Sequence, residues 1–323
     1  MSFSRQAAER ADNVLAAYRR QAEELRIKRT DEIYRKIPQI KKIDDETVSL
    51  GAKMTKAALD GAEDIERIIE NTTVQLSALK ETKSALLKEN GYTENYMSDI
   101  YRCPICRDTG FTDGKPCVCR KKIMSEYDLS SLNLDDSNRF ENFRLDFYSD
   151  VLDEHYKRSP RSQMKDVFEY CKNYAETFSL SSDNIMMYGK VGLGKTFLCS
   201  CIALSLAEKG YSVVFQSAYN IFEIISKNKF NYKTDYSEDI ERLYGCDLLI
   251  MDDLGTEFLT EYTHTALFDI IERRLVSKKP TIINFNLAPK DVEARYSDRI
   301  MSRLLTFTHL LFLGDDIRAA SLR

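Results

Sequence analysis

Residues 183 to 198 read Asp183-Asn-Ile-Met-Met-Tyr-Gly-Lys-Val-Gly-Leu-Gly-Lys-Thr-Phe-Leu198. They contain the spacing G-x-x-x-x-G-K-[ST], which is typical of a phosphate-binding P-loop. Its glycines can adopt positive φ, so backbone N–H groups can turn inward around the β- and γ-phosphates of a nucleotide. The expected nucleotide-binding residues of this loop are Gly189, Lys190, Val191, Gly192, Leu193, Gly194, Lys195, Thr196 and Phe197.

Two side chains of the loop have specific tasks in such a site. Lys195 supplies a positive charge to the phosphates, and the Thr196 hydroxyl is a ligand for Mg²⁺. The apolar run 185–188 predicts a buried strand before the loop, and residues 196–209 predict a helix that Gly210 ends. That helix would add its positive N-terminal end to the anion site. The order of strand, loop and helix predicts a nucleotide-binding α/β domain.

A second nucleotide-binding signal is the apolar run 246–255, which ends in two acids. We expect Asp252 to hold Mg²⁺ directly or through water, because it ends a strand beside the P-loop. Asp253 is the candidate to orient or deprotonate the attacking water, with Glu257 in reserve. Related ATPases more often carry a glutamate at this position. Because an aspartate is shorter, we expect slow hydrolysis.

Polar residues also follow the next predicted strand, which covers residues 279–289. Asn286, just past that strand, is suited to hydrogen-bond the γ-phosphate or the water, and Asn284 is the alternative. A helix over 291–305 and a final strand over 308–313 complete the predicted domain. Arginines on that helix are interpreted either as solubilising surface charges or as functional groups.

The composition is that of a soluble globular protein, with 43% hydrophobic and 30% charged residues among 323. No apolar run approaches the ~18 residues that a membrane span needs, and the N-terminus lacks the apolar core of a signal peptide. We therefore expect a cytoplasmic protein without a membrane partner. Positive charge is in excess over residues 101–125, whereas residues 126–323 are acidic. Strong nonspecific binding of duplex DNA by the nucleotide domain is therefore not expected.

Four cysteines lie close together in the sequence. Cys103 and Cys106 form a C-x-x-C pair, and Cys117 and Cys119 form a C-x-C pair after a turn-rich spacer. Four thiolates in this arrangement match a tetrahedral structural Zn²⁺ site. A disulfide framework is disfavoured in a cytoplasmic protein, and a redox pair would require a C-x-x-C beside a βαβ unit. The segment is interpreted as a zinc-binding hairpin.

The N-terminal third predicts helices. Residues 2–36 read as one long helix that Pro38 breaks, and a second helical run covers 45–89. Apolar and small residues at alternating spacings of three and four form the seam of a helical hairpin or coiled coil. Thr72 and Lys83 weaken that seam, so an antiparallel pair is favoured over a long free-standing coiled coil. The region is either a packing domain or an arm that binds a partner protein.

Two further stretches combine aromatic residues with polar ones. Residues 126–145 are expected to form a polar connector ending in Phe140-Glu-Asn-Phe143, whose rings either pack on the nucleotide domain or line an adenine pocket. Residues 227–236 alternate cations with aromatics, a pattern typical of proteins that bind single-stranded nucleic acid. The alternative is a solvated loop anchored by two aromatic rings. The residues in question are Lys227, Lys229, Phe230, Tyr232 and Lys233.

With these motifs, the chain resembles the bacterial replicative helicase loaders of the DnaC/DnaI type, AAA+ ATPases with an IstB-like ATP-binding domain. Similar landmarks occur almost from end to end. They are Ile37-Pro38, the Cys-Pro-x-Cys…Cys-x-Cys segment, Phe140-Glu-Asn-Phe143, the P-loop, Leu249-Ile-Met-Asp-Asp-Leu-Gly255 and Asp298-Arg-Ile-Met-Ser-Arg-Leu304. The P-loop is shared by many families, whereas the combination with the cysteine segment and the last two motifs is much more specific.

The resemblance implies a RecA-like (AAA+) parallel sheet with flanking helices and ATP bound at subunit interfaces. It implies that Asn286 is the sensor-1 residue, Arg303 the arginine finger with Arg299 close by, and Arg318 a candidate sensor-2 residue. Because such a finger contributes roughly 10³–10⁵ in rate, isolated monomers should hydrolyse ATP poorly. The implied partners are a hexameric replicative helicase, single-stranded DNA and further copies of the chain.

These observations divide the chain into four expected parts. They are a helical helicase-binding domain (1–100), a zinc-binding segment (101–125), a linker (126–145) and an AAA+ ATPase domain without a separate lid (146–323). The expected function is ATP-switched loading of the replicative helicase onto single-stranded DNA, with ATP, Mg²⁺ and Zn²⁺ as cofactors. One alternative is a transposition-helper ATPase of the IstB type that grips duplex DNA, which the acidic ATPase domain disfavours. Another is a scaffold that binds nucleotide without hydrolysing it.

Overall fold

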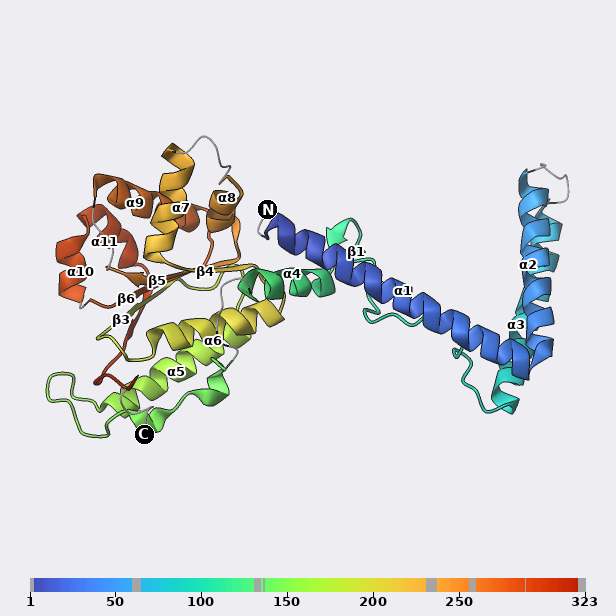
Figure 1. Ribbon diagram of the computed structural model, residues 1–323, viewed down its shortest axis with the longest axis horizontal. Helices are drawn as coiled ribbons and strands as arrows, with labels where there is room; N and C mark the ends of the chain where they lie inside the picture. The colour runs from blue at the N-terminus through green and yellow to red at the C-terminus, as the bar shows by residue number, and fades with distance from the viewer. Residues whose placement is uncertain are drawn as a thin grey trace. The chain divides into compact units, whose positions relative to one another are not determined.

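A computed structural model describes residues 3–59, 65–130, 135, 137–230, 237–255, 260–287 and 289–318 (Figure 1). Contacts divide the chain into two compact units. One unit, called here the ATPase unit, combines Met1–Asn13 with Gly110–Arg323. The other, called the helical unit, is Val14–Thr109. The domain boundaries expected from the sequence, at residues 100, 125 and 145, stay a prediction.

A five-stranded parallel sheet forms the centre of the ATPase unit, in the order β4-β5-β6-β3-β7. Its strands are β3 (Ile185–Tyr188), β4 (Val213–Ser217), β5 (Leu248–Leu254), β6 (Thr281–Phe285) and β7 (Thr308–Leu311). The strand that precedes the P-loop, β3, lies between β6 and β7. The predicted P-loop parallel sheet with flanking helices is therefore confirmed.

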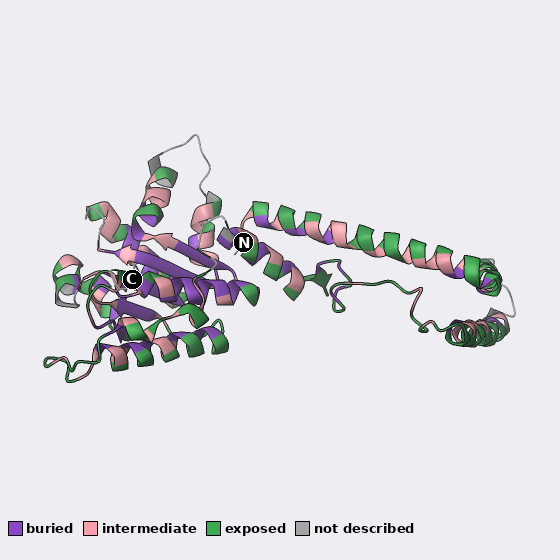
Figure 2. Cartoon of the chain, turned by 60° about the horizontal axis from the view of Figure 1, so that its bottom comes forward, coloured by how far each residue is buried: buried purple, intermediate pink, exposed green. Residues whose placement is uncertain are grey.

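Helices cover both faces of this sheet (Figure 1). They are α4 (Val118–Ser130), α5 (Pro160–Thr177), α6 (Lys195–Glu208), α7 (Ala218–Phe230), α8 (Ser237–Gly245), α9 (Glu261–Val276), α10 (Pro289–Arg295) and α11 (Asp298–Leu304). Successive strand residues point to opposite faces, so one apolar strand can serve two cores. In β5, Leu248 and Ile250 pack in the cluster with α5 and α6, whereas Leu249 and Met251 pack in the cluster with α7, α9 and α11. Figure 2 shows these strands as buried.

Two expectations about the ATPase unit were wrong. The single helix expected over 291–305 is two helices, because Ser297 is extended (φ −67°, ψ 153°) and starts α11. The preceding Tyr296 is buried and packs on Phe285, so tertiary contact holds the break in place. The connector expected from residue 126 is helical up to Ser130, since Leu129 buries its side chain in the core. Two short 3₁₀ helices follow, Phe140–Asn142 and Leu145–Phe147.

The helical unit contains most of α1 (Arg5–Lys36), followed by α2 (Pro38–Leu59) and α3 (Ile65–Glu89). The long first helix and its end before Pro38 are confirmed. The single run expected over 45–89 was wrong, because this stretch belongs to two helices. Lys83, late in α3, pairs with Asp44, early in α2, at 2.6 Å, so the two helices are antiparallel. An antiparallel helix pair is thus present, but α2 and α3 form it rather than the two runs expected from the sequence.

The core of the helical unit lies where α1, α2 and the end of α3 meet, and it consists of Ile33, Ile37, Ile40 and Leu87. Thr72, which the sequence suggested would weaken the seam, is buried in α3. Nearby, Glu32 accepts hydrogen bonds from Lys36, Tyr96 and Tyr92, which lower its pKa to about 2.

The first residues of the chain pack within the ATPase unit. The backbone N–H of Ser4 donates to Asp128 of α4 at 3.1 Å, and the same carboxylate pairs with Arg242 of α8 at 3.1 Å. Ala11 packs in a small apolar cluster with Met124 of α4. The start of α1 is thus anchored to helices that come more than one hundred residues later.

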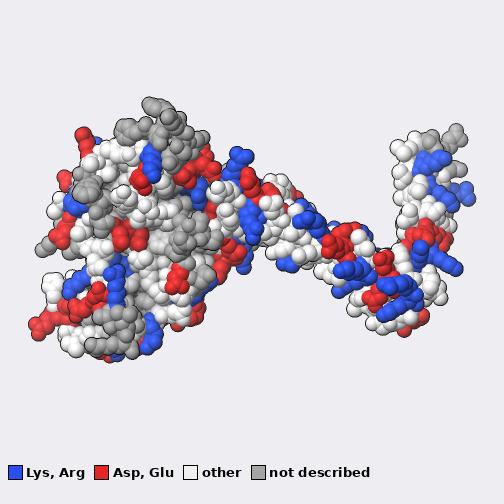
Figure 3. Space-filling model, viewed as in Figure 1, with Lys and Arg blue, Asp and Glu red and all other residues white. Residues whose placement is uncertain are grey.

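The surface of the described residues carries charges of both signs. Figure 3 shows Lys and Arg interspersed with Asp and Glu over the visible face. Among the described helices, none combines the length and the apolar character that a bilayer crossing requires.

Arg274 of α9 is a buried cation inside the ATPase unit, only 1% exposed. Its guanidinium donates to the carbonyl oxygens of Leu243 (2.9 Å) and Pro280 (2.7 Å) and to the hydroxyl of Thr281 (2.9 Å). These acceptors belong to α8 and to the start of β6. The side chain therefore ties α8, α9 and the central sheet together.

We predict that Arg274→Met lowers the free energy of unfolding by roughly 3–5 kcal/mol, because several buried acceptors lose their donor. The neighbouring Arg273 is the matched control: it is exposed and pairs with Asp269 on the surface. Arg273→Met should cost less than about 1 kcal/mol. Urea unfolding followed by circular dichroism measures both variants. Equal losses would contradict the structural role of Arg274.

Candidate functional site

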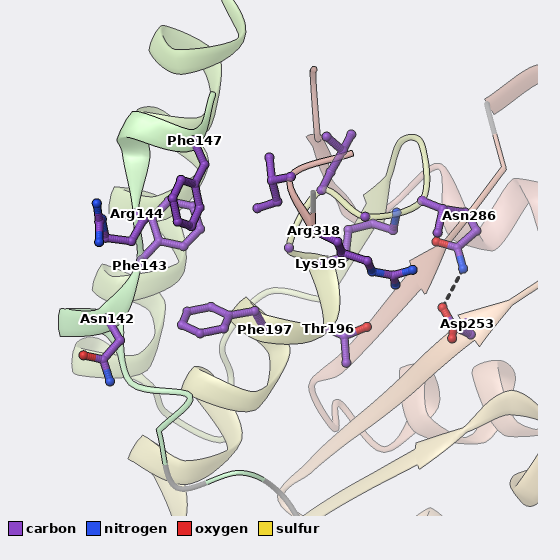
Figure 4. A pocket seen from close by; sticks show the side chains of 15 residues that line it. Asn142, Phe143, Arg144, Phe147, Lys195, Thr196, Phe197, Asp253, Asn286 and Arg318 are labelled. Carbon is purple, nitrogen blue, oxygen red and sulfur yellow. Dashed lines mark hydrogen bonds between the residues drawn. The ribbon is translucent and has the colours of Figure 1, made fainter. Parts of the chain in front are cut away.

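A cavity of about 430 Å³ opens where the P-loop meets the carboxyl ends of β5 and β6 (Figure 4). It is lined by the loop residues 191–197, by Asp253 and Asn286, and by Ile317 and Arg318 near the C-terminus. A further wall comes from the segment before α5, through Asn142, Phe143, Arg144 and Phe147. The structure thus brings together residues from five separate parts of the ATPase unit.

Two glycines of the loop adopt conformations that a side chain would prevent. Gly194 has φ of 84° and directly precedes α6, and a Cβ there would lie 3.1 Å from the Tyr148 hydroxyl. At Gly189 a Cβ would lie 2.3 Å from the carbonyl oxygen of Phe312. Tyr148 in turn donates to the carbonyl of Leu193 at 2.9 Å, so residues outside the motif also hold the loop.

Lys195 begins α6 and folds back over the loop. Its ammonium donates to the carbonyl oxygens of Gly189 (2.9 Å) and Lys190 (2.7 Å). Burial lowers the pKa of Lys195 to about 8, while the charges of Asp253 and Asp252 oppose that shift. A phosphate beside this ammonium would favour its charged form. The position and the chemistry of Lys195 suit a phosphate contact.

Thr196 and Asp252 form an oxygen-rich pair beneath the cavity. The Thr196 hydroxyl lies 3.1 and 3.2 Å from the two carboxylate oxygens of Asp252. Burial raises the pKa of Asp252 to about 6, with a further contribution from the negative charge of Asp253. A carboxylate and a hydroxyl are hard oxygen donors of the kind that Mg²⁺ binds, and a cation there would favour the ionised acid. The residues present therefore fit a magnesium site.

The second acid faces the cavity together with an asparagine. The amide of Asn286 donates to the carboxylate of Asp253 at 2.6 Å (Figure 4). Asn284, the alternative sensor, does not line the cavity: it is fully buried within β6 and contacts Asp252 and the backbone of Asp253. Of the two asparagines, Asn286 is the one placed to meet a nucleotide. Glu257 lies outside the described residues.

The three predicted arginines are in different places. Arg318 lines the cavity, whereas Arg299 and Arg303 of α11 are outside its lining as the described residues define it. The Arg303 guanidinium lies over the ring of Phe268, 4.4 Å from its centroid, and pairs with Glu272. A finger role for Arg303 requires a second copy of the chain and stays a prediction.

The aromatic wall of the cavity was only partly foreseen. Phe143 stacks on Phe168, with ring centroids 4.9 Å apart, lies 6.0 Å from Phe197 and also lines the cavity. Both roles considered for the Phe140–Phe143 segment, packing and pocket lining, are therefore present. Phe147 was missed, although an aromatic residue four positions after Phe143 was a signal in the sequence.

The four predicted cysteines come together. The sulfur atoms of Cys103, Cys106, Cys117 and Cys119 lie within 4.8 Å of one another. The first three are buried, and the fourth is half-buried. The short antiparallel strands β1 (Phe111–Thr112) and β2 (Lys115–Pro116) form the predicted hairpin between the pairs. This donor set fits a tetrahedral zinc ion.

The segment predicted to bind single-stranded DNA is largely outside the described residues. Residues 231–236 are not described, and residues 227–230 are the end of α7. Its role therefore stays a prediction.

Comparison with known proteins agrees with these features. A family model described as IstB-like ATP binding protein matches residues 148–316. The replicative helicase loader DnaC of Escherichia coli K12 is 26% identical over 151 residues, which are 47% of this chain and 61% of that protein. DnaI of Bacillus subtilis 168, also named a replicative helicase loader, is 27% identical over 132 residues, 41% of each protein. The chain thus spans between two fifths and two thirds of the curated relatives that it matches.

A comparison with solved structures matches a crystal structure of the DnaC helicase loader. It is 18% identical, with a TM-score of 0.44, and the match covers 53% of this chain and 97% of that one. An AMPPCP-bound DnaA from Aquifex aeolicus is 23% identical, with a TM-score of 0.46, over 57% of this chain and 52% of that one.

We predict that Lys195→Ala raises the Kd for ATP about 10- to 100-fold, because hydrogen bonds to charged groups contribute about 1.5–3 kcal/mol. Lys165→Ala is the matched control, since this exposed lysine of α5 lies outside the lining of the cavity. This control should bind ATP nearly as the wild type does. Titration of a fluorescent ATP analogue measures both. Equal affinities for the two variants would contradict the assignment of Lys195.

Proposed function

Because the chain belongs to the family of IstB-like ATP binding proteins, we propose that it is an ATP-dependent loader of the replicative DNA helicase onto single-stranded DNA. The observation that carries this proposal is the cavity where the P-loop meets the Asp253–Asn286 pair, with Asp252 beneath it against Thr196. The names of the curated relatives DnaC and DnaI support the choice of helicase loading among the activities of such ATPases.

The proposed hydrolysis uses the residues of this cavity. Lys195 and the backbone donors of the loop bind the β- and γ-phosphates, and Thr196 with Asp252 holds the metal. Bound Mg²⁺ would neutralise charge that develops on the transferred phosphoryl group. Asp253 orients the attacking water and accepts its proton, and Asn286 holds the carboxylate of Asp253 in place. Asn286 also senses the γ-phosphate, and Arg318 contacts the nucleotide from the C-terminal segment.

Self-association completes the proposed site. Arg303, with Arg299 one turn earlier on α11, would reach the nucleotide of a neighbouring copy. The contacts of Arg303 with Glu272 and Phe268 keep its guanidinium ordered before such an encounter. ATP then acts as a switch, because the assembled and the separate states bind it with different affinity.

The helical unit is the proposed helicase-binding arm. Its helices α2 and α3 leave large apolar side chains exposed, among them Val48 (72%), Leu59 (82%) and Val74 (65%). Exposed apolar surface of this kind is typical of sites for protein partners. The proposed division into a helicase-binding domain, a zinc segment and an ATPase domain follows from this assignment. We place the protein in the cytoplasm, with the helicase and single-stranded DNA.

The two alternative functions differ from helicase loading in the partner or in the role of ATP. A transposition helper of the IstB type shares the nucleotide site but has no need of the helicase. A non-hydrolysing scaffold would bind the helicase, but ATP would not change that binding. A test of helicase binding in the presence and absence of ATP therefore separates all three.

We predict that the purified chain forms a complex with the replicative helicase of its host, and that ATP changes the mass of this complex. The double variant Val48→Asp, Val74→Asp should weaken binding at least about tenfold, because it places charges on the apolar arm. Val276→Asp is the matched control: this valine is equally exposed, but it lies in the ATPase unit. Light scattering after gel filtration measures the masses. Absence of any complex would favour the transposition helper, and a complex indifferent to ATP would favour the scaffold.

We predict about one zinc ion per chain, bound by the four clustered cysteines. Cys106→Ser should lose the metal, because a hydroxyl replaces one thiolate ligand. Cys171→Ala, which removes a buried core cysteine of α5, should retain it. Metal analysis of protein purified under reducing conditions without chelator measures the content. A metal-free wild type would refute the zinc site.

A further inference from the structure

The two acids of the candidate site lie at an irregularity in the central sheet. β5 pairs with β6 in regular register up to Met251, but Leu254 then pairs with Phe285, so β5 contains one extra residue. Asp253, within this bulge, has φ of 55°, in the left-handed region that non-glycine residues seldom adopt. Bulges of this kind redirect side chains and are frequent beside active sites.

Asn284 of β6 fills the gap that the bulge leaves in the hydrogen-bond ladder. Its side-chain carbonyl accepts the backbone N–H of Asp253 at 2.8 Å. Its side-chain amide donates to the carboxylate of Asp252. A single buried side chain therefore contacts both acids, one through its backbone and the other through its carboxylate.

The chemistry of this position is restrictive. Asn284 is completely buried, so each polar end of its side chain needs a partner inside the protein. An acceptor must face the backbone N–H, and a donor must face the carboxylate, which only an amide of this length provides at both ends. Its third contact, with the sulfur of Cys199 at 3.9 Å, is weak. Asn286, by contrast, contacts Asp253 from the cavity side.

We propose that Asn284 is a positioning residue for both acids, and this inference rests on the ATP site proposed above. Its carbonyl holds the backbone of Asp253 in the left-handed conformation that turns the carboxylate toward Asn286. Its amide fixes the carboxylate of Asp252 beside Thr196. Asn284 thereby prepares the oxygen ligands for the metal without touching the nucleotide.

The test compares nucleotide affinity with Mg²⁺ and with a chelator, using a fluorescent ATP analogue and the full-length chain. In Asn284→Leu, which keeps the branching at Cγ but removes both hydrogen bonds, the gain in affinity due to Mg²⁺ should fall about tenfold or more. Affinity without metal should stay within about twofold of the wild type, because Lys195 and the loop backbone are unchanged. Cys199→Ala, which among the contacts of Asn284 removes only the weak third one, should preserve both affinities.

A second pair of variants distinguishes loss of the two hydrogen bonds from general misfolding. Asn284→Ser places a smaller polar side chain at this position, so at least one of the two hydrogen bonds is lost without an apolar group being introduced. This variant should show the same selective loss of the gain from Mg²⁺. Asn286→Ala should show the opposite pattern, with slower hydrolysis but a retained gain from Mg²⁺. Urea unfolding of each variant identifies any general loss of structure.

The outcomes separate the two proposals. A wild type that gains no affinity from Mg²⁺ would overturn the proposed ATPase site itself. A wild type with that gain, together with Asn284 variants that keep it within about threefold, would overturn only the positioning role. Equal losses of affinity with and without metal would also overturn it, since they would indicate general disruption of the pocket.

Discussion

The parallel pairing of β3, β6 and β5 is the constraint on which the rest of the molecule depends. Parallel strands end at the same edge of a sheet, so the P-loop after β3, Asn286 after β6 and the acids at the end of β5 are brought to one place. Parallel strands also require coverage on both faces, because crossover connections place helices there. The two apolar clusters, on either side of strands such as β5, meet that requirement.

Sequence alone was a good guide where structure is local. The strands and the P-loop followed from apolar runs and from a motif whose residue types are fixed by phosphate binding. The break at Ser297 did not, since it depends on the burial of Tyr296 against a distant strand. The end of α4 was missed for a similar reason. Leu129 lies in a polar stretch of the sequence, and only its burial in the core of the ATPase unit explains why the helix continues to Ser130.

The candidate site shows the same division. The positions of Lys195, Thr196 and Asp252 could be predicted, because their spacing and their places after strands have direct chemical meaning. The different surroundings of Asn284 and Asn286 could not. They are two residues apart in one segment, but Asn284 lies inside the buried strand β6 beside the bulge of β5, whereas Asn286 follows the strand and lines the cavity.

The anchoring of the first residues has a practical consequence for genetic dissection of this protein. The compact ATPase unit is discontinuous in the chain, since Met1–Asn13 belongs to it and Val14–Thr109 does not. A fragment that begins at residue 110 would lack Ala7 and Ala11, which pack with Met124. It would also lack Ser4, which donates to the carboxylate of Asp128 beside Arg242. A shortened version that keeps these contacts would instead join the first thirteen residues by a short linker to the chain from residue 101 onward, so that Cys103 and Cys106 stay with Cys117 and Cys119.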